Sequence, residues 1–332
     1  MNKIHLNTKL ILFAILILAA TFRLYNINWD QGYHLHPDER AIVLAVTQLK
    51  PPASLNEFLS PSSTWNPHFF AYGSFPMYLL WAAGKALSGF NPSLGQYTSI
   101  NLVGRVMSAF ADLITIILLF KLAKKLFNSK TGLFAAFFYA ISVLPIQLSH
   151  FYAVDTLLTC FIIATLYSLL IFYESPSVKM SFIVGLLFGL SLATKISALV
   201  LLAPIGLALI TDFFLIFLKK PHRPRHWLPH LPKFLKHLIK YAFLIALITT
   251  FTFLLLEPYA LIDFKTFQLQ TVQQSTLNNN PFYFPYHIQY VGKFPSVYDL
   301  SNVFLWVLGS FLDDLYFTGL FFFLILFFTI DR

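Results

Sequence analysis

The run SFIVGLLFGLSLATKISALVLLAPIGLALITDFFLIFL, residues 181–218, decides the fold class of this chain. It is apolar almost throughout and is broken by Lys195 and Pro204. A helix needs about 20 apolar residues to cross a hydrocarbon core of about 30 Å. The run is too long for one crossing, so we expect two membrane-spanning helices joined by a tight turn. The spacing of Gly185 and Gly189 suits close packing against a neighbouring helix.

The composition of the whole chain agrees with a membrane protein. Of its 332 residues, 57% are apolar and only 11% are charged, whereas a soluble domain carries about 25% charged residues. So few charges cannot cover a water-soluble surface, which excludes a soluble globular enzyme, a disordered regulator and a coiled coil. The single cysteine, Cys160, lies in an apolar run and says nothing about the redox compartment.

Further apolar runs predict further spans. Besides 181–194 and 196–218, we expect spans near 10–27, 102–120, 131–149, 156–173, 241–256 and 303–330. The predicted fold class is therefore all-α, a polytopic membrane protein of about eight transmembrane helices in a single membrane-embedded domain over 1–332. The first span could also be a signal peptide, because Lys3 and Lys9 precede it and Ala19 and Ala20 lie near its end. An uncleaved anchor is the simpler interpretation, since more spans follow.

The basic residues indicate the orientation. With a cytoplasmic N-terminus, the short internal segments hold 15 of the 23 lysines and arginines, as the positive-inside rule requires. The basic loop 219–240 should lie along the anionic inner leaflet. The net charge of +9 is then a topology signal, and we expect no nucleic acid partner. The long external segments 28–101 and 257–302 collect acidic residues, so we expect the chemistry at that face.

The richest candidate stretch is NWDQGYHLHPDER, residues 28–40. Asp38 and Glu39 are adjacent, so on a helix they point about 100° apart and cannot share one task. In a structural interpretation, Pro37 takes the first helical position and the two acids complement the helix dipole. The apolar stripe of that helix would lie on the membrane surface: Ile42, Val46 and Leu49. The spacing alone favours neither structure nor catalysis.

Three more charges lie near span ends. Asp155, in HFYAVD (150–155), could cap the following helix or take part in chemistry. Arg105 and Lys195 should both lie at the outer interface. They could snorkel to lipid headgroups, or they could hold an anionic substrate, such as a lipid phosphate.

These stretches together resemble the GT-C membrane glycosyltransferases, and more narrowly the bacterial relatives of protein O-mannosyltransferases and aminoarabinose transferases. The similar motifs follow the family's order and cover nearly the whole chain: RLYNINWDQGYHLHPDER (23–40), GRVMS (104–108), HFYAVD (150–155), ATKIS (193–197), EPYALID (257–263) and QYVG (289–292). Each motif alone is weak, but the ordered set on one side of the membrane is fairly specific.

The resemblance implies transfer of a sugar from a polyprenyl-phosphate donor to an acceptor hydroxyl of a protein, lipid or glycan. The reaction would take place at the external face of a bacterial inner membrane. Asp38 matches the general base, Glu39 its neighbour and Asp155 a second acidic position. Arg105 and Lys195 match cations that hold the donor phosphate. The matching motifs also contain candidates for substrate or lid contacts: His150, Tyr259, Gln289 and Tyr290. One attack assisted by a carboxylate base would invert the anomeric carbon.

Two features of the loops leave alternatives open. A divalent metal could be held by His36, Asp38 and Asp155, with His34, Glu39 and His150 nearby in sequence. Alternatively, the histidines bond to the loop backbone or to the sugar. The aromatic segment NNNPFYFPYHIQY (278–290) could stack on a sugar as a lid, or it could form an interfacial aromatic belt.

A transporter or flippase of a lipid-linked or anionic substrate is the alternative function, and a silent assembly subunit is a third. A transporter should show broken helices, charges at mid-membrane and internal pseudo-symmetry. Here the charges gather at one face beside a long loop, which favours an enzyme. The family's chains run on past the eighth span. We therefore expect this sequence to be the front part of a larger protein, a split reading frame or half of a two-chain assembly.

Overall fold

The computed structural model describes residues 2–219, 228–280, 282 and 285–302. All regular structure within these residues is helical, as expected. The span expected near 303–330 lies outside them. The chain divides into two compact units that alternate along the sequence. The first unit comprises Met1–Gln31, Arg105–Tyr152 and Val272–Arg332, and the second comprises Gly32–Gly104 and Ala153–Thr271.

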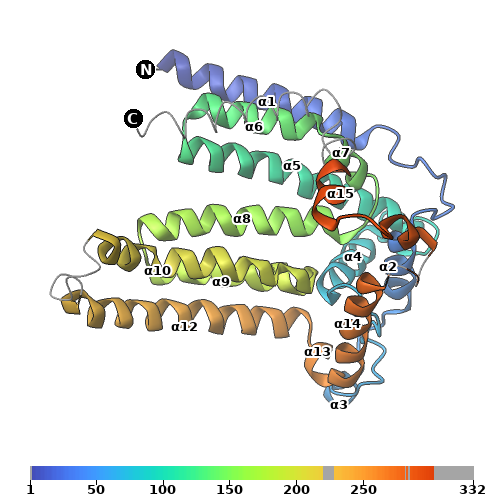
Figure 1. The fold of residues 1–332 in the computed structure, drawn as a ribbon. Helices are drawn as coiled ribbons and strands as arrows, with labels where there is room; N and C mark the ends of the chain where they lie inside the picture. Colours follow the sequence, from blue (N-terminus) through green and yellow to red (C-terminus); the bar gives the residue numbers. More distant parts are fainter. Residues whose placement is uncertain (1, 220–227, 281, 283–284, 303–332) are drawn as a thin grey trace. The chain divides into compact units, whose positions relative to one another are not determined.

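The first unit is built on three long helices that run side by side (Figure 1). They are α1 (Asn2–Leu24), α5 (Ile100–Leu126, which begins in the second unit) and α6 (Ser129–Ile141). Their apolar core consists of Ile15, Ala19, Ile116, Phe120, Ala136 and Ala140. The last part of α14 (Phe264–Asn279), η4 (Pro285–Tyr290) and α15 (Pro295–Asn302) also belong to this unit.

The span expected at 131–149 is bent. Helix α6 is followed by α7 (Val143–Ser149) at an angle of 59°. Ser142 between them has an extended backbone. Pro145 explains the break, because proline has no N–H to donate to the carbonyl of residue 141 and its ring clashes with that carbonyl.

The second unit contains a layer in which α9 (Val178–Thr194) lies between α8 (Val154–Glu174) and α12 (Leu231–Leu256) (Figure 1). After α9 come η2 (Ile196–Leu201) and α10 (Leu202–Lys219). A Cβ placed on Gly185 would lie 2.9 Å from the Ile245 carbonyl oxygen, and one on Gly189 would lie 2.8 Å from that of Thr249. The expected role of the two glycines in close helix packing is therefore confirmed.

The second unit also carries the helices outside these spans. They are α2 (Pro37–Gln48), α3 (Leu55–Phe58), α4 (Ser74–Leu87), η1 (Pro92–Gly95), α13 (Tyr259–Ile262) and the start of α14. The apolar stripe of α2 packs against protein, including α4, and its three residues are at most 5% exposed. Its expected place on the membrane surface is therefore wrong, because protein covers the stripe.

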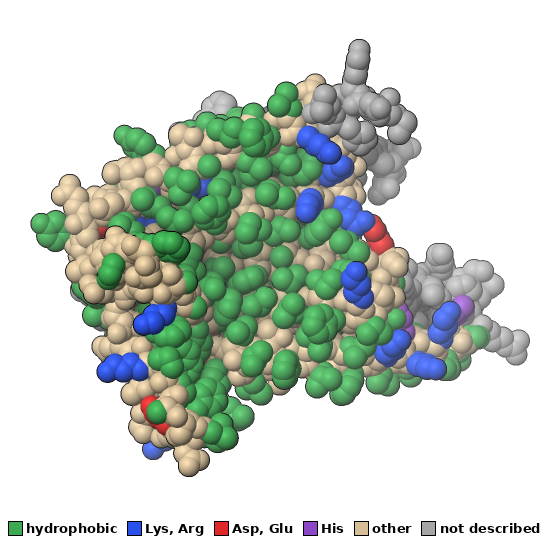
Figure 2. All heavy atoms as spheres, turned by 180° about the vertical axis from the view of Figure 1, so that it is seen from behind, with side chains coloured by type: hydrophobic (Ala, Val, Ile, Leu, Met, Phe, Trp, Pro, Cys, Tyr) green, Lys and Arg blue, Asp and Glu red, His purple; other side chains and the backbone are tan. Residues whose placement is uncertain are grey.

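By length and composition, four described helices can cross a membrane: 7–24, 100–126, 154–174 and 228–256. The bent α6–α7 pair brings the number to five, while 178–194 and 196–211 are shorter apolar helices. The multi-pass expectation is confirmed, and the number eight is not. The basic segment 219–240 is also not wholly a loop, because η3 (Leu228–His230) and the start of α12 form its second half. Figure 2 shows many exposed apolar side chains over one face of the molecule.

Candidate active site

Helix α2 begins as the structural interpretation predicted. His36 is the N-cap, and its Nδ1 accepts a hydrogen bond from the Glu39 N–H at 3.3 Å. Pro37 takes the first helical position, and Glu39 is fully buried. Asp38 is half-buried, and its carboxylate makes no hydrogen bond or ion pair within the described part of the chain. It is therefore available to a proton donor outside the protein.

A second charged group lies where the helices α8 and α9 meet. Lys195 is the C-cap of α9, and its Nζ donates to Asp155 Oδ1 at 3.0 Å. The Nζ also lies 5.5 Å from the centre of the Tyr72 ring. The side chains of Lys195 and Asp155 are 32% and 37% exposed, so a ligand can reach the pair. Of the two alternatives for Asp155, capping of α8 is not observed, because the N-cap is Ala153 and Asp155 binds Lys195.

The chain that carries Tyr72 is held tightly against the end of α9. The Gly73 N–H donates to the Thr194 carbonyl at 3.0 Å, and a Cβ on Gly73 would lie 1.8 Å from the Ala193 oxygen. Only glycine fits this approach. The Ser74 N–H donates to Glu257 Oε2 at 3.0 Å. These two hydrogen bonds fix the backbone that follows Tyr72 against the end of α9 and against Glu257.

Glu257 is buried directly behind this contact, as the residue that follows α12. Burial raises the pKa of its carboxyl to about 8, although the hydrogen bonds from Ser74 oppose the shift. At neutral pH the neutral carboxylic acid therefore predominates. Sequence reasoning placed Glu257 in a motif but did not single it out, because its contact with Ser74 joins residues 183 positions apart.

Arg105 lies in the first unit and has a different environment. Its side chain is fully buried and forms two hydrogen bonds to Asp30, at 3.0 and 2.7 Å. The guanidinium also donates to the Ile27 carbonyl and lies 5.4 Å from the centre of the Trp29 ring. Arg105 was expected at the outer interface, open to a phosphate. The structure places it inside the unit instead, bound to a carboxylate.

A second buried ion pair in the first unit joins Arg23 to Asp112. Arg23 is fully buried. Its guanidinium also donates to the Ala140 carbonyl at 2.9 Å, and the Tyr139 hydroxyl donates to Asp112 at 2.6 Å. A carboxylate inside the apolar run 102–120 was the signal for this pair, because an ionised group within a span needs a partner.

His150 forms hydrogen bonds that connect loops of the first unit. Its Nδ1 lies 2.8 Å from the Ile146 carbonyl and its Nε2 lies 3.0 Å from that of Tyr25. The His150 carbonyl accepts from Trp29 Nε1 at 3.1 Å. These contacts tie the end of α1 to the end of α7.

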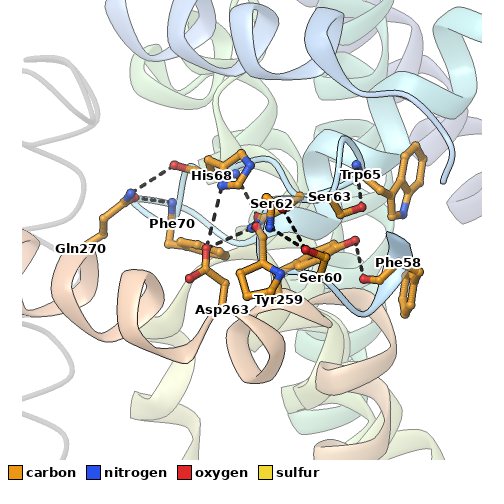
Figure 3. A network of polar contacts seen from close by, with 12 residues as sticks. Phe58, Ser60, Ser62, Ser63, Trp65, His68, Phe70, Tyr259, Asp263 and Gln270 are labelled. Carbon is orange, nitrogen blue, oxygen red and sulfur yellow. Dashed lines mark hydrogen bonds and ion pairs between the residues drawn. The ribbon is translucent and has the colours of Figure 1, made fainter. Parts of the chain in front are cut away.

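Tyr259, a candidate for substrate contact, is buried in a polar network (Figure 3). Its hydroxyl donates to the Phe58 carbonyl at 3.0 Å. Asn66 donates to Asp263 at 3.0 Å, and the Gln270 side chain bonds to the backbone of Phe70 and His68. The network attaches the 58–70 segment to α13 and α14. It accounts for the burial and the hydrogen bond of Tyr259 without a ligand.

The remaining lid candidates, Gln289 and Tyr290, are exposed in the first unit. Both contact Tyr298, whose hydroxyl donates to Gln289 at 3.2 Å and whose ring lies 5.2 Å from that of Tyr290. Residues 281 and 283–284 of this aromatic segment lie outside the described part. Its role as a lid or a belt stays a prediction.

No three His, Cys, Asp or Glu side chains come together as a metal site in the described part of the chain. His36 Nδ1 is moreover occupied as the cap of α2. His34, in contrast, is buried beside Tyr97, and neither of its ring nitrogens has a partner there.

Comparison with known proteins adds to this geometry. Residues 98–255 match the family model of dolichyl-phosphate-mannose-protein mannosyltransferases. The S. cerevisiae protein O-mannosyltransferase Pmt1–Pmt2 complex bound to the sugar donor superposes with a TM-score of 0.54 at 18% identity. That match covers 79% of this chain and 34% of the solved chain. The Archaeoglobus fulgidus oligosaccharyltransferase in the apo form gives a TM-score of 0.53 at 17% identity, covering 82% and 34%.

The chain has a GT-C fold. The GT-C fold that the sequence motifs implied is therefore confirmed, and the chain spans about a third of the length of these solved GT-C chains. A search of curated protein sequences gave no match. The matched region contains Arg105, His150, Asp155 and Lys195 but begins after Asp38 and Glu39.

Proposed function

We propose that this chain forms the catalytic part of an integral-membrane glycosyltransferase. It would transfer a sugar from a polyprenyl-phosphate donor to an acceptor hydroxyl at the external membrane face. The observation that carries the proposal is the partly exposed Lys195–Asp155 pair, at the ends of two apolar helices and within the matched region. The family description, which names a lipid-phosphate sugar, supports this choice of donor.

In this proposal Asp38 is the general base. The acceptor oxygen attacks the anomeric carbon and gives its proton to the Asp38 carboxylate. The bond between that carbon and the phosphate oxygen breaks, and its electron pair leaves with the lipid phosphate. One displacement inverts the anomeric configuration. The absence of any partner for the Asp38 carboxylate among the described residues supports the assignment.

Lys195 would stabilise the departing phosphate. An ammonium has three N–H donors, and Asp155 is the acceptor of one of them. Asp155 and the Tyr72 ring hold the ammonium in place, so its charge is preorganised for the phosphate. A similar role for Arg105 requires that the donor displace Asp30 from a buried ion pair. We therefore assign the donor phosphate to Lys195 first.

The test is transfer of labelled sugar from a polyprenyl-phosphate donor by the purified full chain in lipid vesicles. Asp38→Asn should reduce kcat by about 100- to 10,000-fold, the usual contribution of a general base. Glu57→Gln is the control, because Glu57 is another half-buried carboxylate of the second unit, bound to the Ala53 N–H and Thr64. Unchanged transfer by Asp38→Asn would refute the base assignment. Movement of the lipid-linked sugar across the membrane without transfer would favour the flippase instead.

A further inference from the structure

A pocket of about 520 Å³ lies in the second unit. Its walls are the last turns of α2 and α4, the short helix η1 and the start of α5. The volume is in the range of sites for small ligands, about 300–1,000 Å³. Val46, Leu49 and Ile100 supply apolar lining, and Trp81 adds an indole ring.

Four of the polar side chains at this pocket make no contact with a polar group in the described part of the chain. They are the ammonium groups of Lys50 and Lys85, the amide of Gln96 and the indole N–H of Trp81. None of them makes a hydrogen bond or an ion pair in the described part of the chain. All four can donate, and Gln96 can also accept.

The charge of the pocket is positive. Two lysines line it and no aspartate or glutamate does. The C-terminal ends of α2 and α4 oppose the lysines with about −0.5 charge each. Two full positive charges exceed these partial charges, so the pocket retains a net positive charge and favours an anion.

The Trp81 ring is held in place by neighbouring aromatic residues. It contacts the Trp65 ring edge-on at 4.8 Å, and Trp65 stacks on Tyr78 at 4.9 Å. Trp81, Lys85 and Ser88 follow one another at the spacing of one helix face, so they line the pocket together. A fixed indole beside cations and an amide combines an apolar surface with several donors.

We propose that this pocket binds an anionic saccharide, with its phosphate or carboxylate at Lys50 and Lys85 and its ring against Trp81. The pocket is distinct from the Asp38 end of α2. Asp38 is in the first turn of α2, and the two pocket residues on that helix, Val46 and Thr47, follow it by eight and nine positions, which is about 12–14 Å along a helix. A sugar bound here therefore lies apart from the proposed reaction centre.

The experiment measures binding to the purified full chain in detergent by isothermal titration calorimetry. The probes are glucose 6-phosphate, glucuronic acid, glucose and inorganic phosphate. We expect both charged sugars to bind at least tenfold more tightly than glucose and than inorganic phosphate. Lys50→Gln and Lys85→Gln should each weaken the charged sugars by about tenfold, since each removes a charge-assisted hydrogen bond.

Lys265→Gln is the matched control, because Lys265 is an exposed lysine at the start of α14. It should leave the affinities unchanged, and the melting temperatures of all three variants should equal that of the parent. Equal binding of glucose and glucose 6-phosphate, equal binding of inorganic phosphate, or no binding at millimolar concentrations would each overturn the proposal. The assay needs no sugar transfer, so its outcome is independent of the proposed function.

Discussion

The ion pairs of the two units differ in their exposure to solvent. In the first unit, Arg23–Asp112 and Arg105–Asp30 are fully buried and held by backbone carbonyls as well. In the second, Lys195–Asp155 is about one-third exposed and rests on a single aromatic ring. A buried pair has no room for a substrate, whereas an exposed pair can exchange one partner for a ligand. Burial therefore separates the charges that hold the fold from those that can serve chemistry.

The largest effect should come from breaking a buried pair. Asp30→Ala leaves the Arg105 guanidinium uncompensated and should cost about 3–5 kcal/mol of the free energy of unfolding. Denaturation of the detergent-solubilised chain, followed by circular dichroism, measures this cost.

Adding Arg105→Met to Asp30→Ala should recover much of that stability, because an apolar residue then fills the site. If Arg105→Met alone kept full stability and lost only sugar transfer, Arg105 would be a substrate ligand and the contrast between the units would fail.

The exposed pair should behave in the opposite way. Lys195→Gln should change the free energy of unfolding by less than about 1 kcal/mol, as exposed pairs do. It should reduce kcat for transfer by about 100- to 1,000-fold, the usual effect of removing one electrostatic contact to the transition state. Lys179→Gln, an exposed lysine at the other end of α9, is the control and should leave both quantities unchanged. A stability loss as large as that of Asp30→Ala would show that Lys195 is structural.

Glu257 predicts how the stability depends on pH. Its folded-state pKa of about 8 exceeds the unfolded value of about 4.3. Between these two values the folded chain binds more protons than the unfolded chain, so stability falls as the pH rises, by a few kcal/mol in all. Melting curves from pH 5 to 9 measure the slope. The Glu257→Gln side chain cannot ionise, so this variant should have a flatter slope of stability against pH. An unchanged slope in the variant would show that another group causes the pH dependence.

A further prediction concerns the helix packing that places Lys195 at the end of α9. Gly189→Ala would bring a Cβ to 2.6 Å from that of Thr252, and we expect a cost of about 1–3 kcal/mol. Gly206→Ala is the control, because a Cβ there meets nothing within 4 Å. Equal melting temperatures for the two variants would show that α9 and α12 can move apart at no cost.

Local sequence predicted much of this structure. Apolar length predicted the helices, Pro37 predicted the start of α2, and the two glycines predicted a close helix contact. The same patterns could not assign partners to charges. Arg105 and Lys195 look alike in sequence, as single cations near span ends, yet one is buried against Asp30 and the other is exposed beside Asp155. The pairing depends on contacts between residues 40 to 75 positions apart, which periodicity does not encode.

The Arg23–Asp112 pair also constrains how the chain enters the membrane. The two residues are 89 positions apart, and ribosomes add about 5–20 residues per second. About 5–20 s therefore pass between the synthesis of Arg23 and that of Asp112. During this time the Arg23 side chain, which is near the end of α1, can extend to the membrane interface. Asp112 lies in the middle of α5, so its side chain cannot reach the membrane interface in this way. Helix α5 should thus leave the insertion machinery only after it has docked on α1, which makes assembly of this unit follow the order of synthesis.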